Sequence, residues 1–301
     1  MTGAVSTAVP AADYNSIQST ISSVMGAASL GSTFGYGQTL ISAPVVFGKP
    51  IKAADWQNLY TDISRAYTHQ TGSAPSGAVL PVIAGGATWN AAATSLYASV
   101  ANTCSTNRLV INVANVTNTT PVANTTITRA TAWGSSASAA IACVASFTWA
   151  SEASASAFFN TGGYVYMTLA HPNTSTTQNT AWNSFLSAFG TFTFSGTSIG
   201  KGGGNGAITS IAYSAYTAGG TTVLNTAQTT ANYTANTIAV VVKKITNGMS
   251  VTVTLTDGHT NAFSDAVALG TNAAFGWVRA TDSNNLPTLP VAPTFTKTTN
   301  F

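Results

Sequence analysis

Charged side chains are scarce in this 301-residue chain. Asp, Glu, Lys and Arg make up 6% of the residues, against about 25% in an average soluble domain. Hydrophobic residues stand at an ordinary 45%, so the sequence lacks the low hydrophobicity that produces disorder. A soluble monomer normally relies on surface charge to resist association. We therefore expect its surface to be covered by partner proteins or kept soluble by hydroxyl and amide groups.

The sequence also lacks the features of nucleic-acid and membrane proteins. Its ten basic residues against seven acidic ones are scattered, and only Lys243 and Lys244 are adjacent. Nucleic-acid binding usually requires a basic cluster, so no nucleic-acid partner is expected. No apolar run approaches the roughly 20 residues of a membrane-spanning helix. The first ten residues have no basic region followed by an apolar core, so we expect no secretory signal.

Cysteine, histidine and acidic residues are too few and too scattered to indicate chemistry. Cys104 and Cys143 are isolated and are expected to be buried or free thiols rather than a disulfide. No Gly-x-Ser-x-Gly, His-Glu-x-x-His or Cys-x-x-Cys motif occurs. His69 is placed at a helix end, where a cation favours the dipole, and His171 and His259 in turns. We expect no catalytic, cofactor or metal site.

The carboxylates do not form an obvious pair. A glycosidase needs two of them across a cleft, and Glu152, the single glutamate, lies in a Ser/Ala-rich stretch read as a turn. Asp257, Asp265 and Asp282 fall in turn-like segments, where solvated turn-forming Asp is favoured over a cation site. The glycine-rich loop 200–206 contains a lysine but lacks the order of a phosphate-binding loop.

An internal echo near the N-terminus predicts two helices. Ala12-Asp13-Tyr14-Asn15-Ser16-Ile17 recurs as Ala54-Asp55-Trp56-Gln57-Asn58-Leu59. The pattern predicts helices over 12–25 and 53–69, each with its Asp as cap and each ending before a glycine. Helices this short need tertiary or intersubunit packing. We expect residues 1–72 to form an attachment or assembly module whose candidate assembly residues are Tyr14, Ile17, Ile21, Trp56, Leu59 and Ile63.

Beyond residue 72 the pattern changes twice. Residues 73–107 are interpreted as a linker and a third helix, with Thr88 as cap and Trp89, Leu96 and Val100 on its apolar face. From residue 108 the apolar residues alternate, which predicts strands over 109–113, 140–144, 164–169, 191–194, 238–242 and 251–255.

One more short helix is predicted within the strand region. It covers 179–189, with Asn179 or Thr180 as cap and Trp182, Phe185 and Phe189 on one face. The tail after Asn284 is expected to be extended, completing a β-rich body over 108–301. The fold class is therefore α+β: an N-terminal helical module followed by a mainly antiparallel β-sandwich-like body.

Aromatic residues of the β-rich body leave two interpretations open. Alternation places Tyr164 and Tyr166 on one face of a strand and Val165 and Met167 on the other. Core or intersubunit packing is the first interpretation, and a sugar-binding platform is the alternative. The residues concerned are Tyr164, Tyr166, Phe192, Phe194, Tyr213, Tyr216 and Trp277.

Several short motifs occur in a fixed order: Asp13-Tyr14-Asn15-Ser16-Ile17-Gln18, Gly35-Tyr36-Gly37-Gln38, His69-Gln70-Thr71-Gly72, Phe158-Phe159-Asn160-Thr161-Gly162-Gly163 and Trp182-Asn183. This order resembles the virion structural proteins of cyanobacterial tailed phages, particularly the contractile-tailed type. The resemblance is clearest over 12–72 and 156–195, with no counterpart for 100–155 or the glycine loop. It implies a fibre, a neck or collar element, or a decoration of tail or capsid, and it brings no catalytic residues.

The expected function is therefore that of a non-enzymatic structural component of a bacteriophage virion. The expected partners are other copies of the chain and other virion proteins, and the expected location is the virion, after synthesis in the host cytoplasm and release by lysis. The alternative is a fibre or adhesin module that binds a host receptor or glycan. A polysaccharide depolymerase is the weakest hypothesis because carboxylates are scarce.

Overall fold

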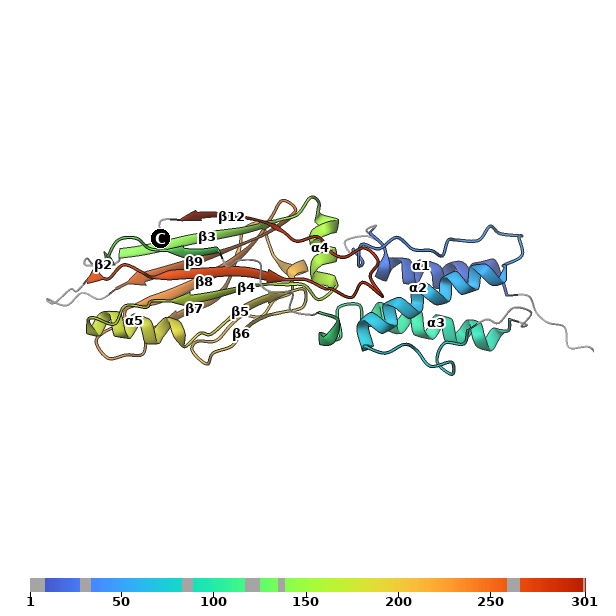
Figure 1. Cartoon of the computed structure of the whole chain (residues 1–301), viewed down its shortest axis with the longest axis horizontal. Coiled ribbons are helices and arrows are strands. Elements are labelled where there is room, and N and C mark those ends of the chain that lie inside the picture. The colour runs from blue at the N-terminus through green and yellow to red at the C-terminus, as the bar shows by residue number, and fades with distance from the viewer. Residues whose placement is uncertain are drawn as a thin grey trace, which may run out of the picture. The chain divides into compact units, whose positions relative to one another are not determined.

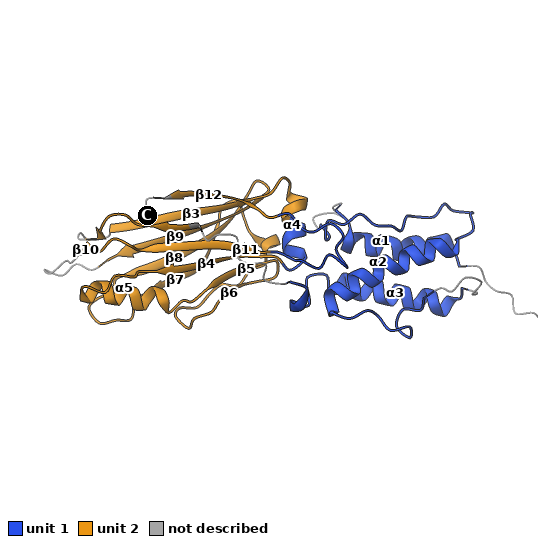
Figure 2. Cartoon of the chain, in the orientation of Figure 1, with its two compact units in different colours: residues 1–117, 156–162, 279–291 blue, residues 118–155, 163–278, 292–301 orange. Residues whose placement is uncertain are grey.

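The computed structural model describes residues 9–27, 34–82, 89–116, 125–134, 139–258, 266–299 and 301. The chain divides into two compact units, blue and orange in Figure 2. The helical unit comprises residues 1–117, 156–162 and 279–291, and the β unit comprises 118–155, 163–278 and 292–301. Helices come first and mostly antiparallel strands follow, so the predicted α+β class is confirmed.

The first two helices of the helical unit agree with the sequence prediction. Helix α1 spans Ala11–Met25 and α2 spans Ala53–Thr71. Both end before a glycine, and Gly72 adopts a left-handed φ of 81° that suits glycine as a helix stop. The predicted Asp caps are wrong because Pro10 and Lys52 occupy the cap positions. Asp55 instead lies inside the first turn, where its carboxylate accepts the Lys52 N–H at 2.7 Å.

The third helix packs in the same unit as the first two. Helix α3 spans Ala91–Thr106, and its cap is Asn90, which accepts the Ala93 N–H at 2.9 Å. The predicted cap, Thr88, lies outside the described residues. Tyr97 is fully buried, whereas Leu96, predicted for the apolar face, is 37% exposed. The helical period places Tyr97, Val100, Ala101 and Cys104 against the core and turns Leu96 away.

Two later segments complete the helical unit. Helix α4 spans Glu152–Asn160, where a turn was expected, and its second half belongs to this unit together with residues 279–291. Ala280 and Leu286 join the core formed by the helices. In place of the predicted division into 1–72, 73–107 and 108–301, the chain enters this unit three times. The alternation of apolar residues does not predict that 156–162 and 279–291 belong to the helical unit, because this depends on contacts between segments far apart in the sequence.

The stretch 109–113, predicted as a strand, contains no strand. It leads instead into a 3-10 turn, η1, over Val113–Asn115. Asn112 accepts the Ala114 N–H at 2.9 Å and donates its side-chain amide to the Thr71 carbonyl at 2.9 Å. These bonds hold the segment at the end of α2, and Val113 remains 85% exposed. Hydrogen bonds of Asn112, rather than strand pairing, therefore hold this segment at the helix end.

Two five-stranded antiparallel sheets form the β unit (Figure 1). The first sheet has the order β1 (Thr125–Thr128), β11 (Asn272–Val278), β4 (Tyr164–Ala170), β5 (Phe192–Ser195) and β6 (Ile199–Lys201). The second sheet has the order β12 (Thr294–Thr299), β3 (Ala139–Thr148), β9 (Gly248–Asp257), β8 (Thr237–Ile245) and β7 (Thr221–Ala227). A short ribbon pairs β2 (Trp133–Gly134) with β10 (Ala266–Val267), and η2 covers Tyr213–Ala215.

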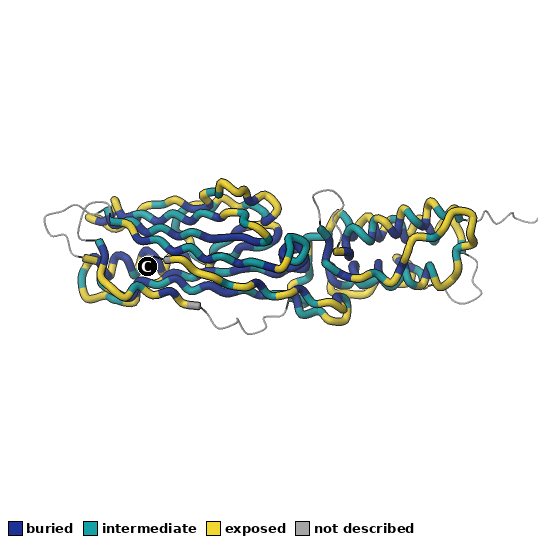
Figure 3. The backbone as a smooth tube through the Cα atoms, turned by 90° about the horizontal axis from the view of Figure 1, so that it is seen from above, coloured by how far each residue is buried: buried dark blue, intermediate teal, exposed yellow. Residues whose placement is uncertain are grey.

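Every second residue of the central strands is buried, and these side chains form the core between the two sheets. Along β9, Val251, Val253 and Leu255 are fully buried, while the threonines between them are partly exposed. The same alternation is visible along the strands in Figure 3. Phe147 of the second sheet lies 6.3 Å from the ring of Phe275 in the first sheet, so the sheets face one another. This sandwich matches the predicted body.

The remaining helix, α5, spans Thr177–Ser187. Its cap is Thr176, whose hydroxyl accepts the Asn179 N–H at 3.2 Å, so the predicted caps lie inside the first turn. Trp182, Phe185 and Phe189 are buried as predicted. Trp182 meets Trp133 with ring centroids 5.1 Å apart, which ties α5 to the short ribbon.

Candidate functional site

The six candidate assembly residues lie in the core of the helical unit. None is more than 4% exposed. Tyr14 meets the edge of Trp56 at 5.0 Å, and Trp56 stacks on Trp89 at 3.9 Å. Their side chains are therefore covered by the same chain and offer no surface to a partner. The repeated pattern of Tyr14, Ile17, Ile21, Trp56, Leu59 and Ile63 is explained by packing within the unit.

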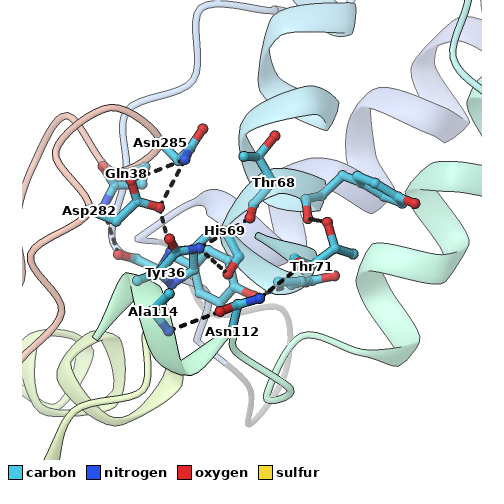
Figure 4. A network of polar contacts seen from close by, with 12 residues as sticks. Tyr36, Gln38, Thr68, His69, Thr71, Asn112, Ala114, Asp282 and Asn285 are labelled. Atoms are coloured by element: carbon cyan, nitrogen blue, oxygen red, sulfur yellow. Dashed lines mark hydrogen bonds and ion pairs between the residues drawn. The ribbon is translucent and has the colours of Figure 1, made fainter. Parts of the chain in front are cut away.

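A buried polar network surrounds His69 at the end of α2 (Figure 4). His69 is fully buried, and its Nδ1 lies 3.0 Å from an oxygen of Asp282, whose side chain is 8% exposed. The Asn285 amide donates to both Asp282 oxygens, at 3.0 and 2.9 Å. Tyr36 meets the imidazole edge-on at 5.3 Å. The network thus joins the loop after α1, the end of α2 and the 279–291 segment.

Burial controls the charge of His69. Loss of hydration lowers the pKa of this imidazole below its usual value, against the opposing effects of Asp282 and the Thr161 backbone. A neutral imidazole on a carboxylate is the arrangement of a general base. A base that is fully covered by its own chain does not reach a substrate. We conclude that the pair holds the segment 279–291 in place.

Three of the five motifs quoted for the resemblance, those that contain Gln38, Gln70 and Asn160, lie in or beside this network. The Gln38 amide donates to the Thr288 carbonyl at 2.8 Å and its oxygen accepts the Thr288 N–H at 2.9 Å. Gln70 donates to the Tyr36 hydroxyl at 2.8 Å. Asn160 donates to the Phe34 carbonyl at 2.6 Å. Hydrogen bonds thus connect three short motifs to other parts of the helical unit, whereas Trp182-Asn183 lies in α5 of the β unit.

His171 directly follows β4, after a strand as expected, and its side chain is buried in the β unit. Its ring nitrogens lie 2.9 Å from the Thr271 hydroxyl and 3.1 Å from the Asn179 side-chain oxygen. The Trp133 indole donates to the same Thr271 hydroxyl at 3.1 Å. Desolvation lowers the pKa of His171, so its neutral form bridges α5 and the start of β11. His259, the third histidine, lies outside the described residues.

Most of the carboxylates are committed to internal contacts. Asp257 is 2% exposed and accepts from Gln178 at 2.8 Å, so its expected role as a solvated turn residue is wrong. Asp62 is 1% exposed and accepts from the Ser42 hydroxyl at 2.7 Å. Asp282 holds His69. Asp265 falls outside the described residues.

Glu152, the first residue of α4, forms an ion pair with Lys244 of β8. The Lys244 Nζ lies 2.5 Å from a Glu152 oxygen and 3.6 Å from the centre of the Tyr213 ring. Burial, followed by the nearby Glu152 charge, raises the pKa of Tyr213. This cluster is an ion pair on an aromatic ring, and the second carboxylate that glycoside hydrolysis needs is not part of it.

The glycine-rich segment 200–206 has a structural explanation. The Gly202 and Gly203 amides donate to the carbonyls of Thr191 and Phe189 at 2.9 and 2.8 Å. A Cβ on Gly203 would lie 1.9 Å from the Ala188 carbonyl oxygen, so glycine is required by close backbone packing. Lys201 donates to the Gly203 carbonyl at 2.6 Å. These amides bind the chain itself rather than phosphate.

The aromatic residues of the β unit separate into two groups. Phe192, Phe194, Tyr213 and Tyr216 are buried, and Trp277 shares the interior face with Phe147, 6.4 Å away. Tyr164 and Tyr166 instead lie on the outer face of the first sheet and are partly exposed. The packing interpretation is therefore confirmed for the buried group, and the sugar-platform alternative is reduced to the two outer tyrosines.

Gly276 is a residue that the sequence reasoning missed. It pairs with Tyr166 across β11 and β4, and a Cβ there would lie 2.3 Å from the Tyr166 hydroxyl oxygen. A glycine inside a strand marks a close approach of another group. The glycine in Phe275-Gly276-Trp277 is the sequence feature that could have pointed to this face.

Within the described ranges, no group of three or more His, Cys, Asp or Glu residues is placed to hold a metal ion. No described helix combines the length and apolarity needed to cross a membrane. Comparison with protein families, curated proteins and solved structures finds no match.

Proposed function

We propose that this chain is a structural component of a bacteriophage virion, associated with the tail, neck or capsid. It acts by self-assembly and by packing on neighbouring virion proteins. The observation that supports the proposal is a β unit whose described surface carries few charges and almost no unpaired negative charge. The resemblance of the sequence motifs to phage virion proteins suggests the particle.

The scarcity of negative charge on this surface follows from where the few carboxylates lie. Glu152 and Asp257 are the only carboxylates among the described residues of the β unit. Asp257 is buried and Glu152 is paired with Lys244. The described residues of the unit also include five basic ones, so repulsion between two copies is limited to these few cations. They are Arg129, Lys201, Lys243, Lys244 and Lys297.

The outer face of the second sheet is the candidate assembly surface. In its centre, Thr254 of β9 lies between Ala142 of β3 and Ala239 of β8. The next row places Thr252 between Val144 and Val241. These side chains are partly exposed, small and uncharged. Lys243 lies on the same face of β8, two residues beyond Val241, and is exposed. The uncharged rows beside it can pack against the same rows of a second copy of the chain.

The size of this face is sufficient for a reversible contact. Five strands at about 4.8 Å spacing and about eight residues at 3.4 Å give roughly 600 Å² per copy, or about 1,200 Å² in total, at the lower end of specific interfaces. If half of the total is apolar, the gross gain is about 15 kcal/mol, against an association cost of roughly 4–15 kcal/mol. Further virion partners would add to this gain.

Sedimentation at micromolar concentration tests the proposal. We expect an oligomer at both low and high salt, because an uncharged contact is little affected by screening. Thr254→Arg places two charges against each other at a symmetric contact and should weaken association at least tenfold. Ser99→Arg, on the exposed side of α3, is the matched control. A stable monomer at both salt concentrations contradicts the proposal.

A second candidate function is the binding of a host-surface glycan by a fibre or adhesin. One separate observation favours it, namely the pair of outer tyrosines on the first sheet. A glycan array is the direct assay, and a protein that retains no glycan contradicts this candidate.

A further inference from the structure

Tyr166 adopts a specific position on the outer face of the first sheet. It pairs directly with Gly276 on the neighbouring strand. A Cβ on Gly276 would lie 2.3 Å from the Tyr166 hydroxyl oxygen and 2.4 Å from its Cζ, so the phenol occupies the space that a side chain would fill. The ring therefore lies across β11, with one face against the backbone and the other directed outward.

The neighbours of this ring are uncharged: those on β4 and β5 carry hydroxyl groups, and those on β11, Ala274 and Val278, are apolar. Tyr164 lies two residues before Tyr166 on the same face, and Thr168 lies two residues after it. Thr193 and Ser195 are the partners of Tyr166 and Tyr164 on β5. Burial, followed by the proximity of Tyr164, raises the pKa of Tyr166. The Tyr166 phenol thus remains neutral, and a phenol group can both donate and accept a hydrogen bond.

An aromatic ring beside neutral hydroxyl groups matches the chemistry of a neutral sugar. A neutral sugar ring presents an apolar face of C–H bonds, which stacks on an aromatic ring, and an equatorial rim of hydroxyl groups, which exchange hydrogen bonds with Tyr, Thr and Ser. An anionic ligand requires a cation that these residues do not provide. A flat apolar peptide would leave the hydroxyl groups without partners.

We infer that the outer face around Tyr164, Tyr166 and Gly276 binds a neutral oligosaccharide chain, with the Tyr166 ring as the stacking platform. This inference deepens the second candidate function and is independent of assembly through the second sheet. Gly276 acts as a positioning residue, because it lets the ring lie across the strand. Thr168, Thr193 and Ser195 supply the surrounding hydroxyl groups.

The decisive variant is Gly276→Ala. It keeps both tyrosines but places a methyl group where the phenol lies. The group that must move is the far end of a side chain, so the ring swings away while the fold is retained. Gly219→Ala is the matched control, since its Cβ meets nothing within 4 Å. Phe47→Ala removes an aromatic residue that is 88% exposed elsewhere and controls for non-specific stacking.

The experiment measures binding of the full chain to immobilised neutral hexasaccharides of glucose, mannose, galactose and N-acetylglucosamine, with hexagalacturonate as an anionic comparison. We expect at least one neutral probe to bind. Gly276→Ala and Tyr166→Ala should each weaken that binding about tenfold or more, as expected for a lost stacking contact, with near-ultraviolet circular dichroism and the melting temperature of each variant as the check on folding. Gly219→Ala and Phe47→Ala should bind like the unchanged chain.

The outcomes separate the inference from the functions proposed above. Binding of a neutral probe that survives both substitutions keeps the glycan function but overturns this face as its site. Binding of hexagalacturonate alone overturns the neutral ligand. Binding of no probe overturns both. A change in sedimentation on Gly276→Ala, without a glycan effect, overturns the inference in favour of a protein contact at this face.

Discussion

Replacing Leu59 by alanine removes three carbon atoms from a side chain that is fully buried in the helical unit. At about 0.8 kcal/mol per buried methylene group, the transfer contribution is roughly 2.4 kcal/mol. The cavity left behind adds to this, and Leu→Ala changes in the T4 lysozyme core cost about 2.7–5.0 kcal/mol. We therefore expect Leu59→Ala to lower the free energy of unfolding of the helical unit by about 3–4 kcal/mol.

Differential scanning calorimetry measures this loss. For a unit of this size, 1 kcal/mol shifts the melting temperature by roughly 3–5 °C, so the transition of the helical unit should fall by about 10–15 °C. Leu96→Ala is the matched control, because Leu96 is 37% exposed on the neighbouring helix. It should change the free energy of unfolding by less than about 1 kcal/mol.

The result that would refute this reasoning is specific. If Leu59 belongs to an intersubunit contact, the variant will dissociate and its melting temperature will depend on protein concentration. If it belongs to the core, the shift will be the same at all concentrations. A melting-temperature shift that depends on protein concentration, or no shift at all, would show that Leu59 is not a core residue and would restore it as a candidate assembly residue.

Two further predictions concern titration. Burial lowers the pKa of His69 and of His171, so the unfolded chain binds more protons than the folded chain below about pH 6.5. Each unit should lose stability as the pH falls from 7 to 5, by up to about 1.4 kcal/mol per pH unit. Urea unfolding at several pH values measures this effect, and the stability of the helical unit should depend less on pH in His69→Gln. A urea midpoint of the unchanged chain that rises on acidification contradicts the prediction. Burial also raises the pKa of Cys104 and Cys143 to about 12. Both thiols should resist a thiol reagent at neutral pH and react together in denaturant, and rapid labelling of either in the native protein would disprove their burial.

Local patterns predicted the elements of this protein well where burial is one-sided. The echo around Tyr14 and Trp56 gave the correct helices because one face of each must leave water. Alternation in β9 gave the correct strand for the same reason. The run at 109–113 misled because a short apolar segment can equally pack on a helix end.

Caps and boundaries were less predictable from residue type. Asp13 and Asp55 are good capping residues, but the cap positions are taken by Pro10 and Lys52, and the helices begin at Ala11 and Ala53. Helix α4 was missed because Glu152-Ala153-Ser154-Ala155 has no strong apolar period of its own. Its second half joins the helical unit, which depends on distant contacts.

The candidate sites depended still more on tertiary structure. Sequence periodicity identified Tyr14 and Leu59 as members of one apolar stripe but did not say whether the stripe meets its own chain or another. Likewise, alternation placed Tyr164 and Tyr166 together, while only strand pairing placed Gly276 beneath the ring.

By itself, the sequence determined the α+β class, the helical start, most strands and the low charge, because these depend on composition and on the periods of helix and strand. Tertiary structure decided which residues far apart in the chain meet. It joined residues 279–291 to the helical unit through Gln38 and His69, and it turned Asp257 inward. The physical reason is that burial of a polar group is decided by its partner, and the partners here lie up to 250 positions away along the chain.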